Sequence, residues 1–462
     1  MAKKIGPLDI YNYLPKTNCG ECGEKTCMAF ASQLIERAVK LEDCPTLTKP
    51  NFAGMYRHLE EMLAPSVKEV VIGVGDSAIK IGGEEVIFRH ELTYFNQTAI
   101  ALDVHDEMKD DELSERVKYV NDFRFKRIGE DLTLDLIAIR SASNDPERFA
   151  QCVSKVSDEA KKPLVLCSWS PSVLEAGLQI VGDQRPLIYA ATKDTWEEVG
   201  RLAVKYSCPV AAFADDDMAE LKSVANALGS MGIEDIVLDP GSHVEGKCFS
   251  NTLGNFVASR RAAILNKDIG YPLLGIPATV WLSEKGVETA FKEVMIAATM
   301  IDKYADLIIL HTPEIWALLP IITLRQNVYT DPRKPVAVDA GLRRFGDPDE
   351  NSPVLMTTNF ALTYYTVASD LESAGIDCYL LVIDTDGLGV QSSVAGGQLD
   401  AFKAREAIKK SGIEDEVKHR KIIIPGFSAR ISGDLEMQSG WEVLVGPRDS
   451  SSIGEFIEKK WS

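Results

Sequence analysis

Between residues 66 and 325, short apolar runs alternate with longer stretches whose apolar residues recur at helical spacing. The runs are continuous and rich in β-branched residues, which is typical of strands buried on both faces. Their starts lie 23 to 37 residues apart, which leaves room for one helix after each strand. We predict eight strands, namely TAIALDV (98–104), LDLIAIR (134–140), PLVLCS (163–168), PLIYAA (186–191), PVAAFA (209–214), DIVLD (235–239), PLLGIP (272–277) and LIILH (307–311).

Eight βα units in about 250 residues match the size of a TIM barrel, and this is the fold we predict for the central region. An open doubly wound sheet would give the same rhythm and stays the alternative. The segment EVVIGVGDSAIKIGGEEVIF (69–88) precedes these strands, alternates more strongly and contains a pair of glycines. It predicts a hairpin ahead of the barrel.

A boundary follows at residues 330–353, where Pro, Gly, Asp and Arg are frequent and no periodicity is sustained. Beyond it a second βα rhythm begins, of the size of an open Rossmann or flavodoxin-like unit. Its predicted strands are PVLMTT (353–358), CYLLVID (378–384), KIIIPG (421–426) and WEVLVGP (441–447). We therefore predict an α/β chain of three domains, with boundaries at 1–62, 63–328 and 329–462.

Composition and charge narrow the class of protein. A chain of 462 residues is too long for one ordinary core. It has no apolar run long enough to span a membrane and no signal-peptide pattern, so we expect a cytoplasmic protein without a membrane partner. Fifty Lys and Arg against 69 Asp and Glu give a net charge of −19, which repels nucleic acid.

Four of the nine cysteines stand close together near the N-terminus, at Cys19, Cys22, Cys27 and Cys44. Thiolates bind soft metals, and a CxxC pair directs two sulfurs at one centre. Zinc ribbons prefer two CxxC pairs, and plant-type 2Fe–2S ferredoxins have the four-residue spacing before the two-residue one. We therefore predict a 4Fe–4S cluster. Zinc and a purely structural metal remain open on spacing alone.

The residues around these cysteines fit a compact metal module. Gly20 and Gly23 would let the backbone turn tightly, and a helical stretch from Cys27 would lead the chain back to Cys44, where Pro45 ends it. A module this small usually borrows stability from a metal. The other five cysteines are scattered and are predicted to be core residues, at Cys152, Cys167, Cys208, Cys248 and Cys378.

Blocks in all three predicted domains resemble one known family, the large (gamma) subunit of the corrinoid/iron–sulfur protein. This family belongs to the acetyl-CoA decarbonylase/synthase and reductive acetyl-CoA systems. The resemblance covers essentially the whole chain in order. The blocks are YLPKTNCGECGEKTCMAFASQL (13–34), FRHELTYFNQTAIALDV (88–104), TTNFALTYYTVASDLE (357–372), LLVIDTDGLGV (380–390), HRKIIIPGFSARISGDLE (419–436) and GWEVLVGPRDSSSI (440–453).

The resemblance implies a methyl carrier, classed with the methyltransferases. A corrinoid cobalt, as Co(I), would accept a methyl group from a methyl-tetrahydropterin and pass it to acetyl-CoA synthase, or the reverse in acetate cleavage. The N-terminal cysteines would hold the 4Fe–4S cluster, which reactivates oxidised cobalt. Implied partners are a small (delta) subunit with its own TIM barrel, the acetyl-CoA synthase subunit and a low-potential ferredoxin-type reductant. The cluster module would have to move or dock to reach the cobalt, so a mobile N-terminal module is also predicted.

The C-terminal domain is the one that the resemblance assigns to the corrinoid, and its strand ends can be judged separately. Ligands of open α/β sheets bind beyond the carboxyl ends of the strands, and here these ends are small, polar or rich in glycine. Asn359 is a plausible helix N-cap, and an arginine before a helix could hold a phosphate. The predicted cofactor-binding residues are Thr357, Thr363, Asp386, Gly387, Leu388, Gly389, Val390, Gly446 and Arg448.

Histidines are scarce where a cobalt ligand would be needed. The chain has no DxHxxG motif, because DVHDEM (103–108) lacks the glycine, and His419 stands just before a strand, at the wrong end of the sheet. We therefore expect a base-off corrinoid without a protein ligand on cobalt. Polar residues near barrel strands form no compact catalytic spacing and are predicted to be structural or interfacial, namely His90, Asp103, Asp135, Asp239, His243 and His311.

Two other functions remain alternatives. The barrel could be a pterin-dependent methyltransferase with the cysteine module as an accessory. The chain could instead be an electron-transfer or reductive-activator protein with a nucleotide or flavin in its C-terminal domain, although no GxGxxG or P-loop supports this. The sequence leaves open the pterin, the direction of the reaction and the lower base of the corrinoid.

Overall fold

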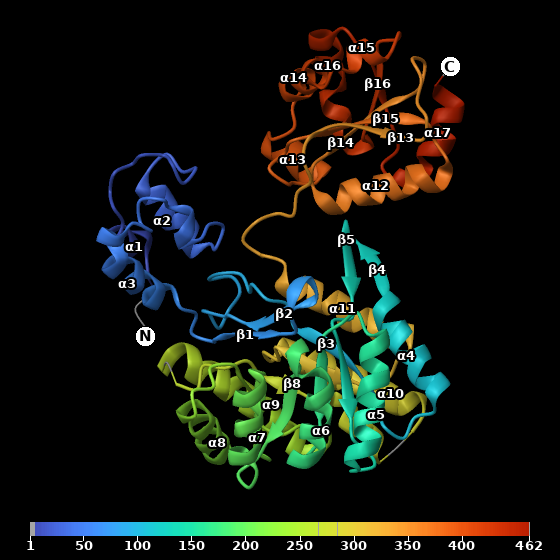
Figure 1. The fold of residues 1–462 in the computed structure, drawn as a ribbon. Coiled ribbons are helices and arrows are strands. Elements are labelled where there is room, and N and C mark those ends of the chain that lie inside the picture. The colour runs from blue at the N-terminus through green and yellow to red at the C-terminus, as the bar shows by residue number, and fades with distance from the viewer. Residues whose placement is uncertain (1–4, 267, 284, 462) are drawn as a thin grey trace. The chain divides into compact units, whose positions relative to one another are not determined.

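The computed structural model describes residues 5–266, 268–283 and 285–461 (Figure 1). Their contacts divide the chain into two compact units. The first runs through Phe125 and resumes over Leu132–Thr330, and the second comprises Lys126–Asp131 and Asp331 onward. The N-terminal module groups with the first unit, and the domain boundary at residue 62 stays a prediction.

The first unit contains the predicted barrel. Eight parallel strands follow the order β10-β9-β8-β7-β6-β3-β12-β11, and a parallel bridge between Leu238 and Leu273 joins the two ends of the sheet. The eight predicted runs are therefore confirmed as strands of one closed sheet. Their bounds are β3 (Ala99–His105), β6 (Leu136–Arg140), β7 (Leu164–Cys167), β8 (Leu187–Ala191), β9 (Val210–Phe213), β10 (Ile236–Asp239), β11 (Leu274–Gly275) and β12 (Leu307–Leu310).

One helix follows each of these strands and lies outside the barrel, as Figure 1 shows. Buried Val, Leu, Ile and Phe side chains from the helices and from the outer faces of the strands form the larger core. A second core fills the barrel interior and is rich in alanine and valine. The helices are α4 (Asp110–Asp122), α5 (Pro146–Glu159), α6 (Pro171–Val181), α7 (Trp196–Tyr206), α8 (Met218–Ser230), α9 (Gly246–Arg261), α10 (Val287–Asp302) and α11 (Ile315–Tyr329).

The predicted hairpin ahead of the barrel is present as β1 (Glu69–Ile72) and β2 (Ile79–Gly82), which pair antiparallel. The backbone N–H of Gly73 donates to the carbonyl of Arg185, which precedes β8. Val70, Ile72 and Ile81 belong to the interior core of the barrel. The hairpin therefore closes the amino-terminal end of the barrel, and the carboxyl ends of the strands form the other mouth.

Three helices form the N-terminal module: α1 (Pro7–Tyr11), α2 (Cys27–Ile35) and α3 (Ala53–Leu63). They share a small core of their own, in which Ile10, Phe30 and Leu59 are almost completely buried. The sequence did not predict the hairpin of β4 (Arg124–Arg127) and β5 (Glu130–Thr133). Its turn has positive φ at both Ile128 and Gly129, the geometry of a tight hairpin turn.

The second unit is an open α/β sheet with the strand order β13-β15-β14-β16-β17. Strand β13 (Gly341–Phe345) is an antiparallel edge that lies inside the predicted boundary segment, where the sequence had not predicted a strand. The four parallel strands match the predicted runs. They are β14 (Val354–Thr358), β15 (Cys378–Ile383), β16 (Lys421–Ile424) and β17 (Glu442–Val445).

Six helices cover this sheet: α12 (Ala361–Ala374), α13 (Val390–Gly396), α14 (Ala401–Ser411), α15 (Ile413–Glu416), α16 (Ser432–Ser439) and α17 (Ile453–Lys460). From β14 the chain continues to β15 on one side, whereas β16 and β17 lie on the other. The strand order thus reverses between β14 and β16. Such a switch point opens a crevice in which ligands of doubly wound sheets bind.

Candidate functional sites

The four N-terminal cysteines line one small cavity, together with Leu14, Pro15, Thr17, Asn18, Gly20, Glu24 and Phe30. Gly20 and Gly23 both have positive φ, at 75° and 86°, so the CxxC loop turns in a way that favours glycine. The Asn18 side chain accepts a hydrogen bond of 2.9 Å from the backbone N–H of Cys27. The CxxC loop, the start of α2 and the turn that ends at Cys44 therefore bring all four thiols to one cavity.

The thiols of this module differ in environment. Cys19 is exposed, and hydrogen bonds from the Glu21 backbone and the Thr17 hydroxyl lower its pKa. Cys27 and Cys44 are buried, and burial raises the pKa of Cys44. Four soft donors around one cavity suit an iron–sulfur cluster, which binds thiolates. Among the described residues, no three His, Cys, Asp or Glu side chains converge as closely as a single metal ion requires.

Arg37, just after α2, ties this module to the hairpin that closes the barrel. Its guanidinium donates to Glu69 Oε1 at 3.0 Å, to the Gly83 carbonyl at 2.8 Å and to Glu85 Oε1 at 2.9 Å. It also lies 4.3 Å from the centre of the Phe95 ring. A module that moves would have to release these contacts, and its mobility stays a prediction.

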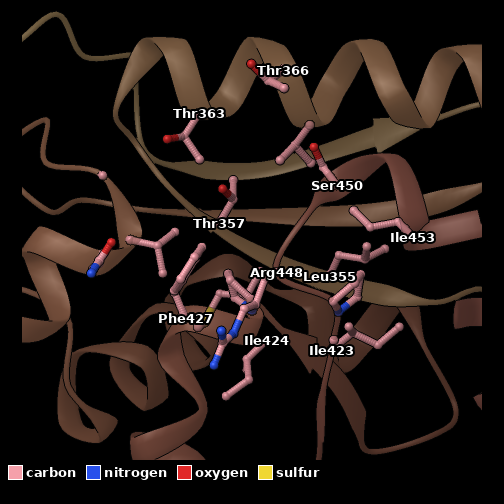
Figure 2. Close-up of a pocket in the computed structure, with 18 of the residues that line it drawn as sticks. Leu355, Thr357, Thr363, Thr366, Ile423, Ile424, Phe427, Arg448, Ser450 and Ile453 are labelled. Carbon is pink, nitrogen blue, oxygen red and sulfur yellow. The ribbon is translucent and has the colours of Figure 1, made fainter.

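The second candidate site lies at the switch point of the C-terminal sheet. A cavity of about 430 Å³ opens beside the ends of β14 and β16 and extends under α12 (Figure 2). Its wall is mostly aliphatic, with a few hydroxyls and one arginine. The lining residues are Leu355, Met356, Thr357, Leu362, Thr363, Thr366, Val367, Leu380, Gly389, Val390, Gln391, Ser392, Ile423, Ile424, Pro425, Phe427, Gly446, Pro447, Arg448, Ser450 and Ile453.

Two buried hydroxyls at the end of β14 have no partner within the described part of the chain. Thr357 is 2% exposed and Thr358 is fully buried, and neither Oγ1 makes a hydrogen bond. Of these two threonines only Thr357 lines the cavity. A buried polar group without a partner is costly, and a ligand in the cavity that bonded the Thr357 hydroxyl would relieve that cost.

Six of the nine predicted cofactor-binding residues line this cavity: Thr357, Thr363, Gly389, Val390, Gly446 and Arg448. The other three, Asp386, Gly387 and Leu388, lie in the turn just before it. Sequence reasoning missed the apolar depth of the cavity, because Leu355, Leu380 and Ile423 carry no pattern that separates a cavity wall from an ordinary core.

The turn of Asp386 to Leu388 is held by Asn359, which the sequence suggested as a helix cap. That suggestion was wrong, because Phe360 is the N-cap of α12 and makes no side-chain bond there. The Asn359 side chain instead accepts from the backbone N–H groups of Thr385 at 2.9 Å and Gly387 at 3.0 Å. It therefore acts across the sheet edge, between the ends of β14 and β15.

Arg448 stands at the rim of the cavity, after β17. Its guanidinium lies 5.5 Å from the centre of the Phe427 ring, which also lines the cavity. The Arg448 side chain is exposed. His419, the histidine of this unit, lies before β16 and its Nε2 is 3.0 Å from the Ser352 carbonyl. The residues that line the cavity include no histidine.

The carboxyl mouth of the barrel also carries polar groups, but they are paired with one another. Asp103, at the end of β3, lies 2.6 Å from His311 Nδ1, 3.2 Å from Arg116 Nη2 and 3.4 Å from Arg140 Nε. Burial disfavours its ionisation, yet the hydrogen bond and charge of His311, with the two arginines, lower the pKa of Asp103 below its usual value. Glu293, also buried, accepts bonds from the backbone of His311 and Thr312 and from Trp281.

A second buried acid closes the opposite side of this mouth. Asp239 accepts a bond of 2.8 Å from the Tyr189 hydroxyl and one of 2.9 Å from the backbone N–H of Gly241. Burial raises its pKa to about 7. His243 pairs with the exposed Asp215 at 2.8 Å. These contacts satisfy the acids inside the protein.

The remaining predicted polar and cysteine residues lie apart from both sites. Asp135 pairs with Arg325 and also accepts from the Ile100 backbone, before β6 at the amino end of the barrel. His90 stacks on Phe88. Cysteines 152, 208 and 378 are buried as predicted, Cys167 is half-buried, and Cys248 is exposed on α9, so its assignment to the core was wrong. The described residues contain no helix long and apolar enough to span a membrane.

The cysteine cavity and the cavity of the C-terminal sheet both lie in parts of the chain that match known families. The family described as "CO dehydrogenase/acetyl-CoA synthase delta subunit" matches residues 69–457, and one described as an Fe-S cluster matches residues 14–46. The chain is 51% identical to acetyl-CoA decarbonylase/synthase complex subunit gamma 2 of Methanosarcina thermophila, over 98% of each chain. It is 46% identical to the gamma subunit of Methanothermobacter thermautotrophicus, over 99% of each. Dihydropteroate synthase of Thermus thermophilus is 16% identical, with a TM-score of 0.39, over 56% of this chain and 99% of that one.

Proposed function

Because this chain belongs to the gamma-subunit family of the acetyl-CoA decarbonylase/synthase complex, we propose that it is the corrinoid methyl carrier of that complex. The observation that carries the proposal is the cavity at the switch point of the C-terminal sheet, with the unpartnered Thr357 hydroxyl in its wall. A site of this kind suits a large, partly apolar cofactor with polar edges.

The cavity wall has two kinds of surface, one apolar and one polar. The deep part of the cavity is apolar and would exclude water from the tail of a bound corrinoid. It is formed by Leu355, Leu380 and Ile423 from the sheet and by Val367 and Ile453 from the helices. The hydroxyls of Thr357 and Thr363 face the cavity from the end of β14 and from α12, as Figure 2 shows. They would bond polar groups at the edge of a corrinoid.

A bound corrinoid would supply a cobalt centre that can take up a methyl group and release it. The residues of this chain bind and orient that group. No histidine lines the cavity, so the chain offers no imidazole to the cobalt from this wall. A metal without a strong donor on one side is easier to reduce, which suits a low-potential electron source.

Cys19, Cys22, Cys27 and Cys44 are the proposed ligands of a 4Fe–4S cluster. Iron–sulfur potentials reach about −700 mV at their low end, so a cluster here could return oxidised cobalt to its reactive state. We propose that the cluster repairs accidental oxidation of the cobalt. A ferredoxin-type reductant would supply the electrons to the cluster.

The proposed partners follow from membership in the complex. A family described by the name of the delta subunit matches most of a chain whose relatives are gamma subunits. The two subunits therefore share sequence over this region, which supports a heterodimer of two related barrels. A methyl-tetrahydropterin donor and the acetyl-CoA synthase subunit would exchange the methyl group.

The direct test is a titration of the full chain with aquocobalamin, followed by its visible spectrum. The wild type should bind, and Thr363→Trp should weaken binding by about 100-fold, because an indole would fill space between α12 and β14. Ser373→Trp adds the same group at an exposed position near the end of α12 and should bind normally. A wild-type chain without a corrinoid band would contradict the proposal.

The cluster is tested separately with Cys27→Ala after anaerobic reconstitution. This variant should lose the iron–sulfur absorption and the reductive activation of bound cobalamin, yet bind aquocobalamin as tightly as the wild type. Unchanged activation in Cys27→Ala would show that the cysteine module has another role.

A further inference from the structure

Asn359 lies at the point where the binding cavity and its neighbouring loop meet. It follows β14 and is 6% exposed. Its backbone N–H donates to the Ile383 carbonyl at 2.8 Å, which extends the pairing of β14 with β15 by one residue. Its side chain is therefore fixed at the edge of the sheet from which the β15–α13 loop starts.

The side-chain amide of Asn359 is bonded to this loop through both its oxygen and its nitrogen. Its Oδ1 accepts from the backbone N–H groups of Thr385 and Gly387, and lies 3.0 Å from the Thr385 hydroxyl. Its Nδ2 donates to Asp384 Oδ1 at 3.0 Å. A flipped amide would set two donors against two N–H groups, so the network fixes one orientation.

The loop that Asn359 holds has an unusual backbone. Asp386 and Gly387 both have positive φ, at 56° and 71°, and the Leu388 N–H donates to the Thr385 carbonyl at 3.1 Å. On its other side, a Cβ at Gly387 would lie 2.8 Å from Pro335. The turn is thus confined between Asn359 and Pro335, and a non-glycine residue in the left-handed region needs such support.

The end of this turn becomes the wall of the cavity. Gly389, Val390, Gln391 and Ser392 line it, directly after Leu388. A displacement of the turn would move these residues, because Leu388 alone separates the bonded Gly387 from the start of the wall. Asn359 itself is not among the lining residues.

We propose that Asn359 is a positioning residue, which fixes the cavity wall at Gly389 to Ser392 by holding the turn of Thr385 to Leu388. This inference rests on the proposed corrinoid function and deepens it. The asparagine needs both of its polar atoms, an acceptor for two amides and a donor for Asp384. Neither aspartate nor alanine can supply both.

The test is a substitution and its compensation in the full chain. Asn359→Asp keeps the acceptor but places a carboxylate against Asp384, and like charges at this distance repel. Aquocobalamin affinity should fall by about tenfold. The double variant Asn359→Asp with Asp384→Asn removes the like charge, so it should recover most of the lost affinity. Recovery stays incomplete because the Asp386 N–H bonds the same Asp384 oxygen that accepts from Asn359.

Hydrogen exchange of the protein without ligand supplies the second measurement. In Asn359→Asp the amides of Thr385 and Gly387 should exchange faster, whereas the amides of β14 and β15 should not, and the double variant should reverse the change. A residue that only stabilised the fold would raise exchange throughout the sheet. Asn351→Asp adds the same charge at an exposed position of this unit and should change neither measurement.

Two results would overturn the inference: unchanged affinity in Asn359→Asp despite faster exchange of the turn, or loss of affinity that the double variant does not restore. If even the wild type bound no aquocobalamin, the proposed function would be wrong. The exchange rates would then decide by themselves whether Asn359 holds the turn.

Discussion

Two edges of parallel sheet in this chain have similar architecture, but their polar groups differ in whether they have partners. The barrel mouth and the C-terminal switch point both lie at carboxyl ends of strands, where α/β proteins place their ligands. At the barrel mouth, Asp103 and Asp239 are bonded to arginine, histidine and tyrosine side chains of the same barrel. At the switch point, the Thr357 hydroxyl has no partner among the described residues and faces a cavity of about 430 Å³.

The difference separates a polar site that stabilises from one that can bind. Charged groups that satisfy one another leave little for a ligand to gain, and they resist change because each depends on the others. A buried hydroxyl without a partner costs stability until a ligand supplies one. We therefore propose the binding role for the Thr357 hydroxyl and a structural role for the paired acids and histidine of the barrel mouth.

The largest expected effect comes from breaking the charge cluster of the barrel mouth. Asp103→Asn should destabilise the barrel by about 3–5 kcal/mol, because Arg116, itself mostly buried, would lose its counter-ion. Urea unfolding followed at the amides of the barrel strands would measure this. Glu175→Gln removes an exposed partner of Lys205 and should change stability by less than about 0.5 kcal/mol. A mild effect of Asp103→Asn with retained aquocobalamin binding would mean that the mouth is not a sealed structural cluster.

The second prediction concerns pH and the buried acid on the other side of the mouth. The pKa of Asp239 is raised from about 3.8 to about 7, so the folded barrel binds its proton more readily than the unfolded chain. Its stabilising effect is complete below the ordinary pKa and is lost as the pH rises through 7. Between pH 5 and 8 this loss amounts to about 3 kcal/mol.

Asp239→Asn removes this titration and should flatten the stability of the barrel between pH 5 and 8. Asn can still bond both groups, since its carbonyl oxygen can accept from the Gly241 amide while its NH₂ donates to the Tyr189 hydroxyl oxygen. Asp158→Asn makes the same chemical change at an exposed position of α5 and should leave the wild-type slope unchanged. Equal slopes in all three proteins would contradict the assignment.

Much of the fold was predictable from the sequence, and part of it was not. Continuous apolar runs predicted all eight barrel strands and the four parallel strands of the C-terminal unit. A strand that is buried on both faces has apolar residues at nearly every position, and this is easily recognised in the sequence. Strand β13 was missed, since an edge strand with two arginines among its five residues has no continuous apolar run. The β4–β5 hairpin was missed because its pattern is polar and short.

At the cavity of the C-terminal sheet, the residues that the sequence singled out lie at the rim and not in the apolar depth. Glycines and threonines after strands indicated the edge of the site. Leu355 and Ile423 read as core residues, and only three-dimensional packing decides whether an aliphatic side chain meets another or faces a void. The role of Asn359 was also hidden, because its partner Thr385 lies 26 residues away along the chain.

The third prediction compares two neighbouring threonines and sharpens the contrast within a single strand. Thr357→Val should stabilise the ligand-free C-terminal unit by up to about 1 kcal/mol, because it removes a buried hydroxyl without a partner. It should also weaken aquocobalamin binding by about tenfold, through the lost hydrogen bond. Thr358→Val removes the same kind of hydroxyl on the other face and should stabilise equally without any change in affinity. Equal affinity in both variants would remove the case for Thr357 as a ligand contact.

The smallest expected effect is at Arg448, the exposed cation of the cavity rim. Its side chain stays in solvent beside Phe427, so water and salt screen its attraction for an anion. Arg448→Ala should weaken aquocobalamin binding by about threefold, and cobinamide, which lacks the phosphate of the nucleotide tail, should bind the variant and the wild type equally. Arg430→Ala removes an exposed arginine that does not line the cavity and should affect neither ligand. The difference between the two corrinoids decides the assignment: if Arg448→Ala weakened both alike, the arginine would shape the rim through Phe427, and the phosphate of the tail would have to lie elsewhere.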